Sequence, residues 1–66
     1  MIIFIQHDAP PQLSVRRALD TLVKAGIYSA EGGGSINDRP LIIIDAAHGP
    51  EAIAALGKAG MRPVIG

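Results

Sequence analysis

The chain has 66 residues, no cysteine and a formal net charge of zero at pH 7. Without cysteine it has no disulfide and no cysteine-based zinc site, and without a basic excess we do not expect it to bind nucleic acid or a charged membrane surface. A chain of this length forms one domain, residues 1–66, and buries only ~60% of its unfolded surface, so association with a partner would add needed stability.

The first strand is predicted at residues 1–6, where apolar side chains occupy both alternating sets of positions. Strands with one wet face alternate apolar and polar residues, so this continuous run indicates cover on both sides. The run is too short to span a membrane and lacks the basic leader of a signal peptide, so we expect a cytoplasmic protein. Pro10 and Pro11 suit the entry of a helix, with Asp8 or Ser14 as its cap.

The first helix is the clearest element of the chain. Its apolar residues have helical spacing and form one stripe, made of Val15, Ala18, Leu19, Leu22 and Val23. Gly26 ends the helix, and residues 27–31 are predicted as a short second strand. The glycine-rich segment 32–38 is predicted as a loop between strands, because it lacks the Gly-Lys-Ser/Thr ending of a phosphate-binding loop.

The most apolar strand is predicted at residues 41–44, a continuous Leu-Ile-Ile-Ile run that again indicates cover on both faces. Pro50 opens a second helix over residues 51–59. Residues 61–65 form the last strand, which Pro63 places at an edge of the sheet because proline cannot donate to a strand ladder.

Strand, helix and strand therefore occur twice along the chain. The natural arrangement for this order is the ferredoxin-like split βαβ sandwich (βαββαβ), an α+β fold with two helices on one face of a four-stranded sheet. The first and third strands are central in that fold and are also the most apolar strands here. The sequence therefore favours it over a small parallel Rossmann-like α/β sheet.

Two helices cover only one face of such a sheet, so the other face displays apolar side chains of the central strands. Exposed apolar patches usually mark interaction sites. The candidate interface is the set Ile2, Phe4, Ile42 and Ile44. The alternating set Ile3, Ile5, Leu41 and Ile43 is equally apolar, so the sequence does not choose between the two faces.

Four polar residues follow the two central strands and are candidates for ligand binding: His7, Asp8, Asp45 and His48. If the two strands were adjacent and parallel, these side chains and both helix N-termini would share one edge of the sheet. Two histidines and two carboxylates can bind a divalent metal, and helix N-termini can bind an anion. The spacing matches no dedicated motif, and helix caps or loop side chains are the simpler interpretation, so no metal or cofactor is predicted.

The function predicted from these patterns is a non-enzymatic protein-binding module. It would act through the apolar sheet face as a homodimer, or as an inhibitor or adaptor of a larger protein. One alternative is an ACT-like regulatory module that binds a small anion or an amino acid at the helix N-terminal edge. The other is a metal-dependent enzyme that uses the four polar residues. Free edges of the second and fourth strands would also allow β-augmentation.

Overall fold

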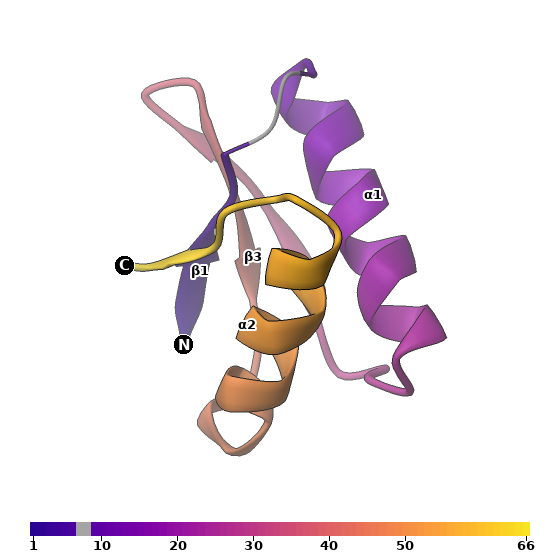
Figure 1. Ribbon diagram of the computed structural model, residues 1–66. Coiled ribbons are helices and arrows are strands. Elements are labelled where there is room, and N and C mark those ends of the chain that lie inside the picture. The colour runs from indigo at the N-terminus through magenta and orange to yellow at the C-terminus, as the bar shows by residue number, and fades with distance from the viewer. Residues whose placement is uncertain (7–8) are drawn as a thin grey trace.

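The computed structural model describes residues 1–6 and 9–66 (Figure 1). The elements, in chain order, are β1 (Ile2–Phe4), α1 (Pro11–Lys24), β2 (Glu31–Ile36), β3 (Arg39–Ile43), the 3₁₀ turn η1 (Ala46–His48), α2 (Gly49–Lys58) and β4 (Val64–Ile65). The strands form one sheet in the order β2-β3-β1-β4, and each neighbouring pair is antiparallel. The protein is thus α+β. The parallel α/β sheet considered as an alternative is wrong, because no described pair of strands runs parallel.

The two most apolar strands, β1 and β3, lie in the middle of the sheet, as the sequence predicted. Their residues pair in antiparallel register, with Ile2 opposite Ile43 and Phe4 opposite Leu41. The sheet continues one step beyond β1, because the N–H of Ile5 donates to the carbonyl of Pro40 at 2.9 Å. The backbone N–H and C=O groups of β1 and β3 are hydrogen-bonded to neighbouring strands on both sides. Their side chains point alternately to the two faces of the sheet.

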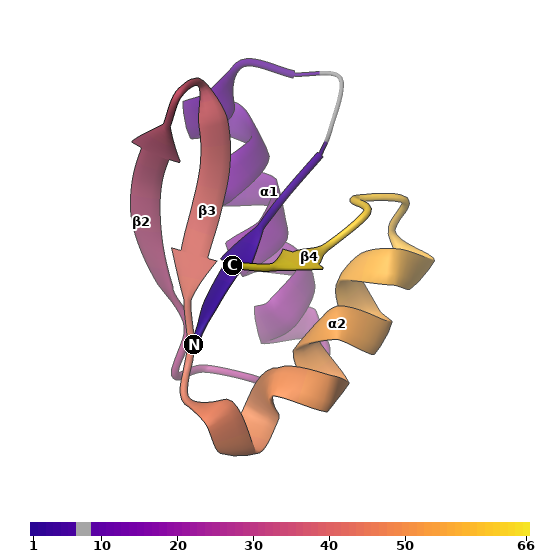
Figure 2. The same ribbon diagram turned by 90° about the vertical axis from the view of Figure 1, so that its left-hand side faces the viewer.

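Both helices lie on one face of the sheet, and no described element covers the other face (Figure 2). The core fills the space between. The sheet contributes Ile3, Ile5, Ile42 and Ile44, and the helices contribute chiefly Leu22 and Leu56. Each of these side chains is at most 2% exposed. Burial of one such side chain is worth about 1.5–3 kcal/mol relative to exposure, so this small core supplies most of the favourable free energy of folding.

The sheet register corrects the predicted interface. Directly opposed residues of an antiparallel pair lie on the same face, so Ile2 shares its face with Ile43 and Ile3 shares its face with Ile42. The predicted interface combined Ile2, Phe4, Ile42 and Ile44. Its last two members lie in the helix-covered core, at 0% and 2% exposure. The predicted interface failed because the pairing register decides which alternating residues of the two strands lie on the same face. The sequence of either strand alone does not determine that register.

The second strand lies further along the chain than predicted. The segment 27–30 lies outside any strand, and most of the predicted glycine-rich loop belongs to β2. At two of these glycines, neighbouring side chains occupy the space that a Cβ would take. A Cβ on Gly33 would overlap the Cδ1 of Leu41, and one on Gly32 would lie 2.9 Å from the Cγ1 of Val15. Glycine-rich composition usually indicates a loop, but these glycines allow close approach of a helix and a strand.

A two-residue turn joins β2 to β3. Asn37 and Asp38 have φ values of 51° and 62°, as a type I′ hairpin turn requires. That turn is favoured because its twist matches the twist of the strands that it joins. Asn and Asp enter this left-handed region more readily than other residues with a side chain. The Asn-Asp pair is a sequence signal for a hairpin turn. The prediction did not use this signal, because it assigned both residues to a longer loop.

The first helix begins at Pro11, a favoured first helical residue. Ser14, predicted as a possible cap, is instead buried inside the helix, where its Oγ donates to the carbonyl of Ala9 at 3.3 Å. The other predicted cap, Asp8, lies outside the described residues. The last strand, β4, is confirmed at an edge of the sheet, directly after Pro63.

Candidate functional site

The structure does not provide the shared edge on which the predicted polar site depended. Because β1 and β3 are antiparallel, the chain leaves β1 next to the start of β3 and leaves β3 at the opposite end of the sheet. The premise of two parallel strands is therefore wrong. Asp45 and His48 lie together after β3, whereas His7 and Asp8 lie outside the described residues. Within the part of the chain that is described, no three His, Cys, Asp or Glu side chains gather where they could hold a metal ion.

The helix N-termini are also separated. α1 follows β1 and α2 follows β3, so the two helices begin at opposite ends of the sheet and run in opposite directions (Figure 1). The expectation that both helices start at one edge is therefore wrong. An anion cannot lie between the two helix starts, as the ACT-like alternative requires.

Asp45 is the centre of a polar cluster at the turn between β3 and α2. Its Oδ1 accepts a hydrogen bond from the Ser29 Oγ at 2.7 Å, and its Oδ2 lies 2.6 Å from the Nδ1 of His48. Ser29 belongs to the loop between α1 and β2, so the cluster connects this loop to the turn that starts α2. Asp45 makes no side-chain capping hydrogen bond to the described backbone, so the capping role considered for it is not observed.

The cluster shifts the ionisation of both of its titratable members. The hydrogen bonds from Ser29 and His48 lower the pKa of Asp45 to about 2. The hydrogen bond to Asp45 and the negative charge of its carboxylate raise the pKa of His48. The hydroxyl of Ser29 donates to the carboxylate and not to the imidazole. His48 therefore does not activate it as the histidine of a Ser-His-Asp triad activates its serine, and the cluster functions as an electrostatic link.

We expect the Asp45–His48 pair to stabilise the fold in mildly acidic solution. The pKa of His48 is raised above 6.5, so its contribution is complete below pH 6.5 and is lost as the pH rises through the higher folded-state value. The pKa of Asp45 falls from 3.8 to about 2, so its contribution is present above pH 3.8 and is lost as the pH falls through about 2. An NMR titration should give His48 a pKa above 6.5, and Asp45→Asn should lower it.

The spectrum of His48→Gln identifies which histidine signal belongs to His48, because the chain has two histidines. Both partners are nearly half exposed, at 46% and 44%, so the shift should shrink as salt screens the pair. A His48 pKa that is not raised, and that does not change in Asp45→Asn, would contradict the link between the two side chains.

The second candidate is the sheet face that the helices leave open, called here the outer face. By the strand register its apolar residues are Ile2, Phe4, Ile36, Leu41, Ile43 and Val64. Ile2, Ile43 and Val64 are 39%, 45% and 43% exposed. Leu41 is nearly buried because it lies against Gly33 of β2. The face is therefore an apolar surface in which the nearly buried Leu41 lies among exposed aliphatic side chains.

Among the described strand residues of the outer face, one is basic and one is acidic. Arg39 alternates with Leu41 and Ile43 along β3 and so lies on the same face, with its guanidinium carbon 4.2 Å from the centre of the Phe4 ring. Glu31 pairs with Ile43 at the other end of β3. Both charged residues are exposed. The outer face thus carries one charge of each sign, with the guanidinium of Arg39 on the Phe4 ring in the middle of the face and Glu31 beside Ile43 at one end.

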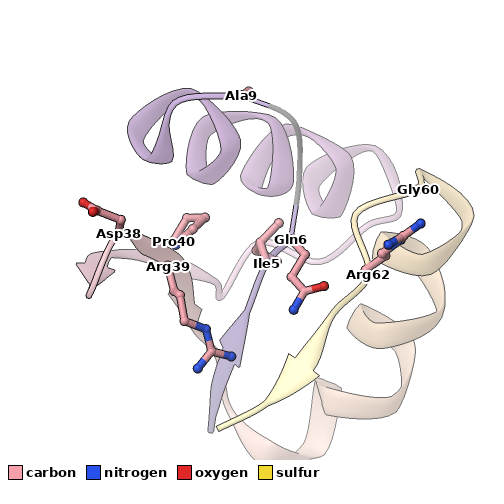
Figure 3. Close-up of a pocket in the computed structure, with 8 residues that line it drawn as sticks. All are labelled: Ile5, Gln6, Ala9, Asp38, Arg39, Pro40, Gly60 and Arg62. Atoms are coloured by element: carbon pink, nitrogen blue, oxygen red, sulfur yellow. The ribbon is translucent and has the colours of Figure 1, made fainter.

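The third candidate is a cleft of about 500 Å³ at the end of the sheet where the chain leaves β1 (Figure 3). Its lining residues are Ile5, Gln6, Ala9, Asp38, Arg39, Pro40, Gly60 and Arg62. Arg39 and Arg62 lie on either side of Gln6, but their side chains extend in different directions. They therefore do not form a cradle for an anion. No sequence pattern indicated this cleft, because separate segments of the chain form its walls.

Comparisons with known protein families, with curated proteins and with solved structures found no match for this chain. Neither described helix combines the length and the apolar composition needed to cross a bilayer. Of the three candidates, the outer face gives the clearest physical reason to bind a partner. Its exposed aliphatic side chains are stabilised when a second surface removes them from water.

Proposed function

We propose that this protein is a non-enzymatic binding module that docks on a second copy of itself through the outer face. The observation that carries the proposal is the exposure of Ile2, Ile43 and Val64, each close to 40% or above. Ile2 and Ile43 lie on strands whose alternate residues form the core. Contiguous apolar patches of this kind are rare on soluble monomers and mark interaction sites. A domain of 66 residues has a small core and is stabilised by a further buried surface.

The charges of the outer face favour a second copy over a partner of one dominant charge. An acidic partner would suit Arg39 and oppose Glu31, and a basic partner would do the reverse. A copy of the same face offers one charge of each sign, so the face can complement itself. The inhibitor or adaptor role on a larger protein stays as the alternative outcome of the experiment below.

We also propose that the architecture is the ferredoxin-like split βαβ sandwich. The strand order β2-β3-β1-β4, the antiparallel pairing of all neighbours and the location of both helices on one face support it. An experimental structure with another strand order would contradict it. The absence of cysteine from the chain suits the reducing cytoplasm, where we place the protein.

The test of self-docking is the substitution Ile43→Lys. Lysine at this position lies opposite Glu31 in the same strand pair, so it suits the isolated chain, whereas in a dimer it brings an ammonium group into the apolar surface that the second copy covers. Light scattering at tens of micromolar should give the wild type twice the chain mass of 6.8 kDa and the variant a single chain mass.

Val23→Lys is the matched control. Val23 is 50% exposed on α1, on the helical side of the molecule, so this variant should remain a dimer. A monomeric wild type would contradict self-docking. If the monomer nevertheless bound a larger protein of its host, and Ile43→Lys alone abolished that binding, the adaptor role would replace self-docking.

A further inference from the structure

The free edge of β2 presents two residues whose backbone groups have no partner in the sheet. β2 is an end strand of the order β2-β3-β1-β4. Pro40 and Ile44 hydrogen-bond to the residues that flank β1, and because successive residues of a strand bond to alternate sides, Ile42 between them also bonds toward β1. The residues of β2 opposite Pro40 and Ile42 are Ser35 and Gly32. Their N–H and C=O groups therefore point away from the sheet.

A bulge brings both residues to the same edge. In a regular strand the backbone groups of residues three apart point to opposite edges. In β2 the register shifts between Gly32 and Ser35, and the extra residue there restores the phase. Gly34, which has a φ of 75°, lies within the bulge. The free edge thus carries two outward-pointing residues with a glycine-rich bulge between them.

A groove runs beside this edge, between β2 and the first turns of α1. It has a volume of about 390 Å³, and its lining residues are Pro11, Gln12, Val15, Gly32, Gly34 and Ser35. None of these residues is charged, and those of β2 have no side chain larger than that of serine. Another strand can therefore approach the free edge without meeting a charged or bulky side chain.

We propose that the free edge of β2 pairs with the same edge of a second copy, in antiparallel register, so that Gly32 of each copy lies opposite Ser35 of the other. The two-fold axis is perpendicular to the sheet and passes between Gly33 and Gly34, and the two sheets become one. This contact is separate from the outer face and does not rest on the proposed self-docking.

The positions of the hydrogen-bonding groups select this register. Antiparallel strands bond through directly opposed residues that both point toward the partner. With Gly32 opposite Ser35, the N–H and C=O groups of both residues in both copies are paired. An axis through Gly32 or through Ser35 would use only one residue of each copy. In the proposed register Glu31 also lies opposite Ile36 of the second copy, so the two carboxylates do not meet.

The helices fit the same arrangement. α1 packs against both β2 and β3 (Figure 2), so its axis lies roughly one strand spacing, ~4.8 Å, from the boundary between the copies. The two-fold axis keeps both copies of α1 on the same side of the joined sheet, ~10 Å apart, which is a distance at which helices pack. Val15 and Leu19, which lie against Gly32, are only partly buried. The second copy would cover this flank of α1.

The experiment uses Ile43→Lys as the parent chain, because the outer-face contact should be absent from it. Each backbone hydrogen bond adds only modest net stability, so we expect the edges to pair near 1 mM and not at tens of micromolar. At 1 mM, sedimentation equilibrium should give the parent twice the chain mass of 6.8 kDa. Adding Ser35→Pro removes an outward N–H and should weaken this pairing by about tenfold or more.

Two matched controls accompany Ser35→Pro. Ser35→Ala keeps the N–H and removes only the hydroxyl. Ile65→Pro places a proline at an equivalent position on the opposite edge of the sheet, because Ile65 is opposite Ile3, whose backbone bonds toward β3. Both controls should pair as the parent does, and circular dichroism shows whether each variant is folded.

Amide hydrogen exchange tests the pairing without a substitution at the β2 edge. In the parent, the amides of Gly32 and Ser35 should exchange more slowly at 1 mM than at tens of micromolar. The amide of Ile65, which points outward from the other edge, should exchange at the same rate at both concentrations. This measurement decides the question if Ser35→Pro fails to fold.

The inference is supported if the parent pairs at 1 mM, if Ser35→Pro alone weakens the pair, and if exchange slows at Gly32 and Ser35. A parent that is a single chain at 1 mM overturns it, as does a folded Ser35→Pro that pairs equally well. Slower exchange at Ile65 instead would assign the contact to β4 and also overturn it. A wild type that is monomeric at tens of micromolar overturns the outer-face docking only, because the edge is measured in a chain that lacks that contact.

Discussion

Replacing Ile42 with alanine should lower the free energy of unfolding by about 2–5 kcal/mol, whereas the same replacement at the next residue, Ile43, should lower it by about 1 kcal/mol or less. The two residues are adjacent and chemically identical. Ile42 is fully buried in the core beneath the helices, and Ile43 is 45% exposed on the outer face. Only the removal of Ile42 leaves a cavity that the surroundings cannot fill.

The effect at Ile42 should be visible as near loss of the fold. At about 0.05–0.15 kcal/mol per residue, a domain of 66 residues has a stability of only ~3–10 kcal/mol. Urea unfolding followed by circular dichroism measures the change in both variants. The comparison is made over a range of protein concentrations, because a dimer interface at Ile43 would add a concentration-dependent term for that variant alone. Equal losses at both positions in dilute protein would show that the register, and with it the outer face, is assigned wrongly.

Replacing Gly33 with valine should destabilise the protein by about 1–3 kcal/mol, the usual effect of forcing extra carbon atoms into a packed site. A Cβ at this position would overlap the Cδ1 of Leu41 and would lie 3.3 Å from the Cγ1 of Ile43. Leu41 would have to leave its nearly buried position, so the variant should also weaken association through the outer face. Thermal unfolding measures the first effect, and light scattering measures the second.

Ser35→Val is the control for this prediction. Ser35 lies in the same strand, is exposed and pairs with Pro40, and a β-branched residue suits such a position. The control should have nearly wild-type stability. If Gly33→Val were equally stable, β2 would not lie against Leu41, and the glycine-rich segment would be the loop that its composition suggested.

The error in the predicted polar site had one source, the direction of a single strand pair. The sequence placed β1 and β3 correctly in the middle of the sheet, because a continuous apolar run needs neighbours and cover on both sides. It did not contain their relative direction. The local pair of Asp45 and His48, three residues apart, could be found from the sequence, whereas the contact with Ser29 depends on how a distant loop packs.

By itself, the sequence determined the elements whose cause is local. Helical spacing defined α1, proline marked the edge strand β4, and continuous apolar runs identified the two central strands. The tertiary structure alone decided which isoleucines are covered, because a face is shared through pairing register and not through sequence position. It also decided that the glycine-rich segment belongs to a strand, because the side chains that occupy the Cβ space of Gly32 and Gly33 come from α1 and β3. Local preference acts between neighbours in the chain, whereas burial is a property of surfaces that meet only when the chain has folded.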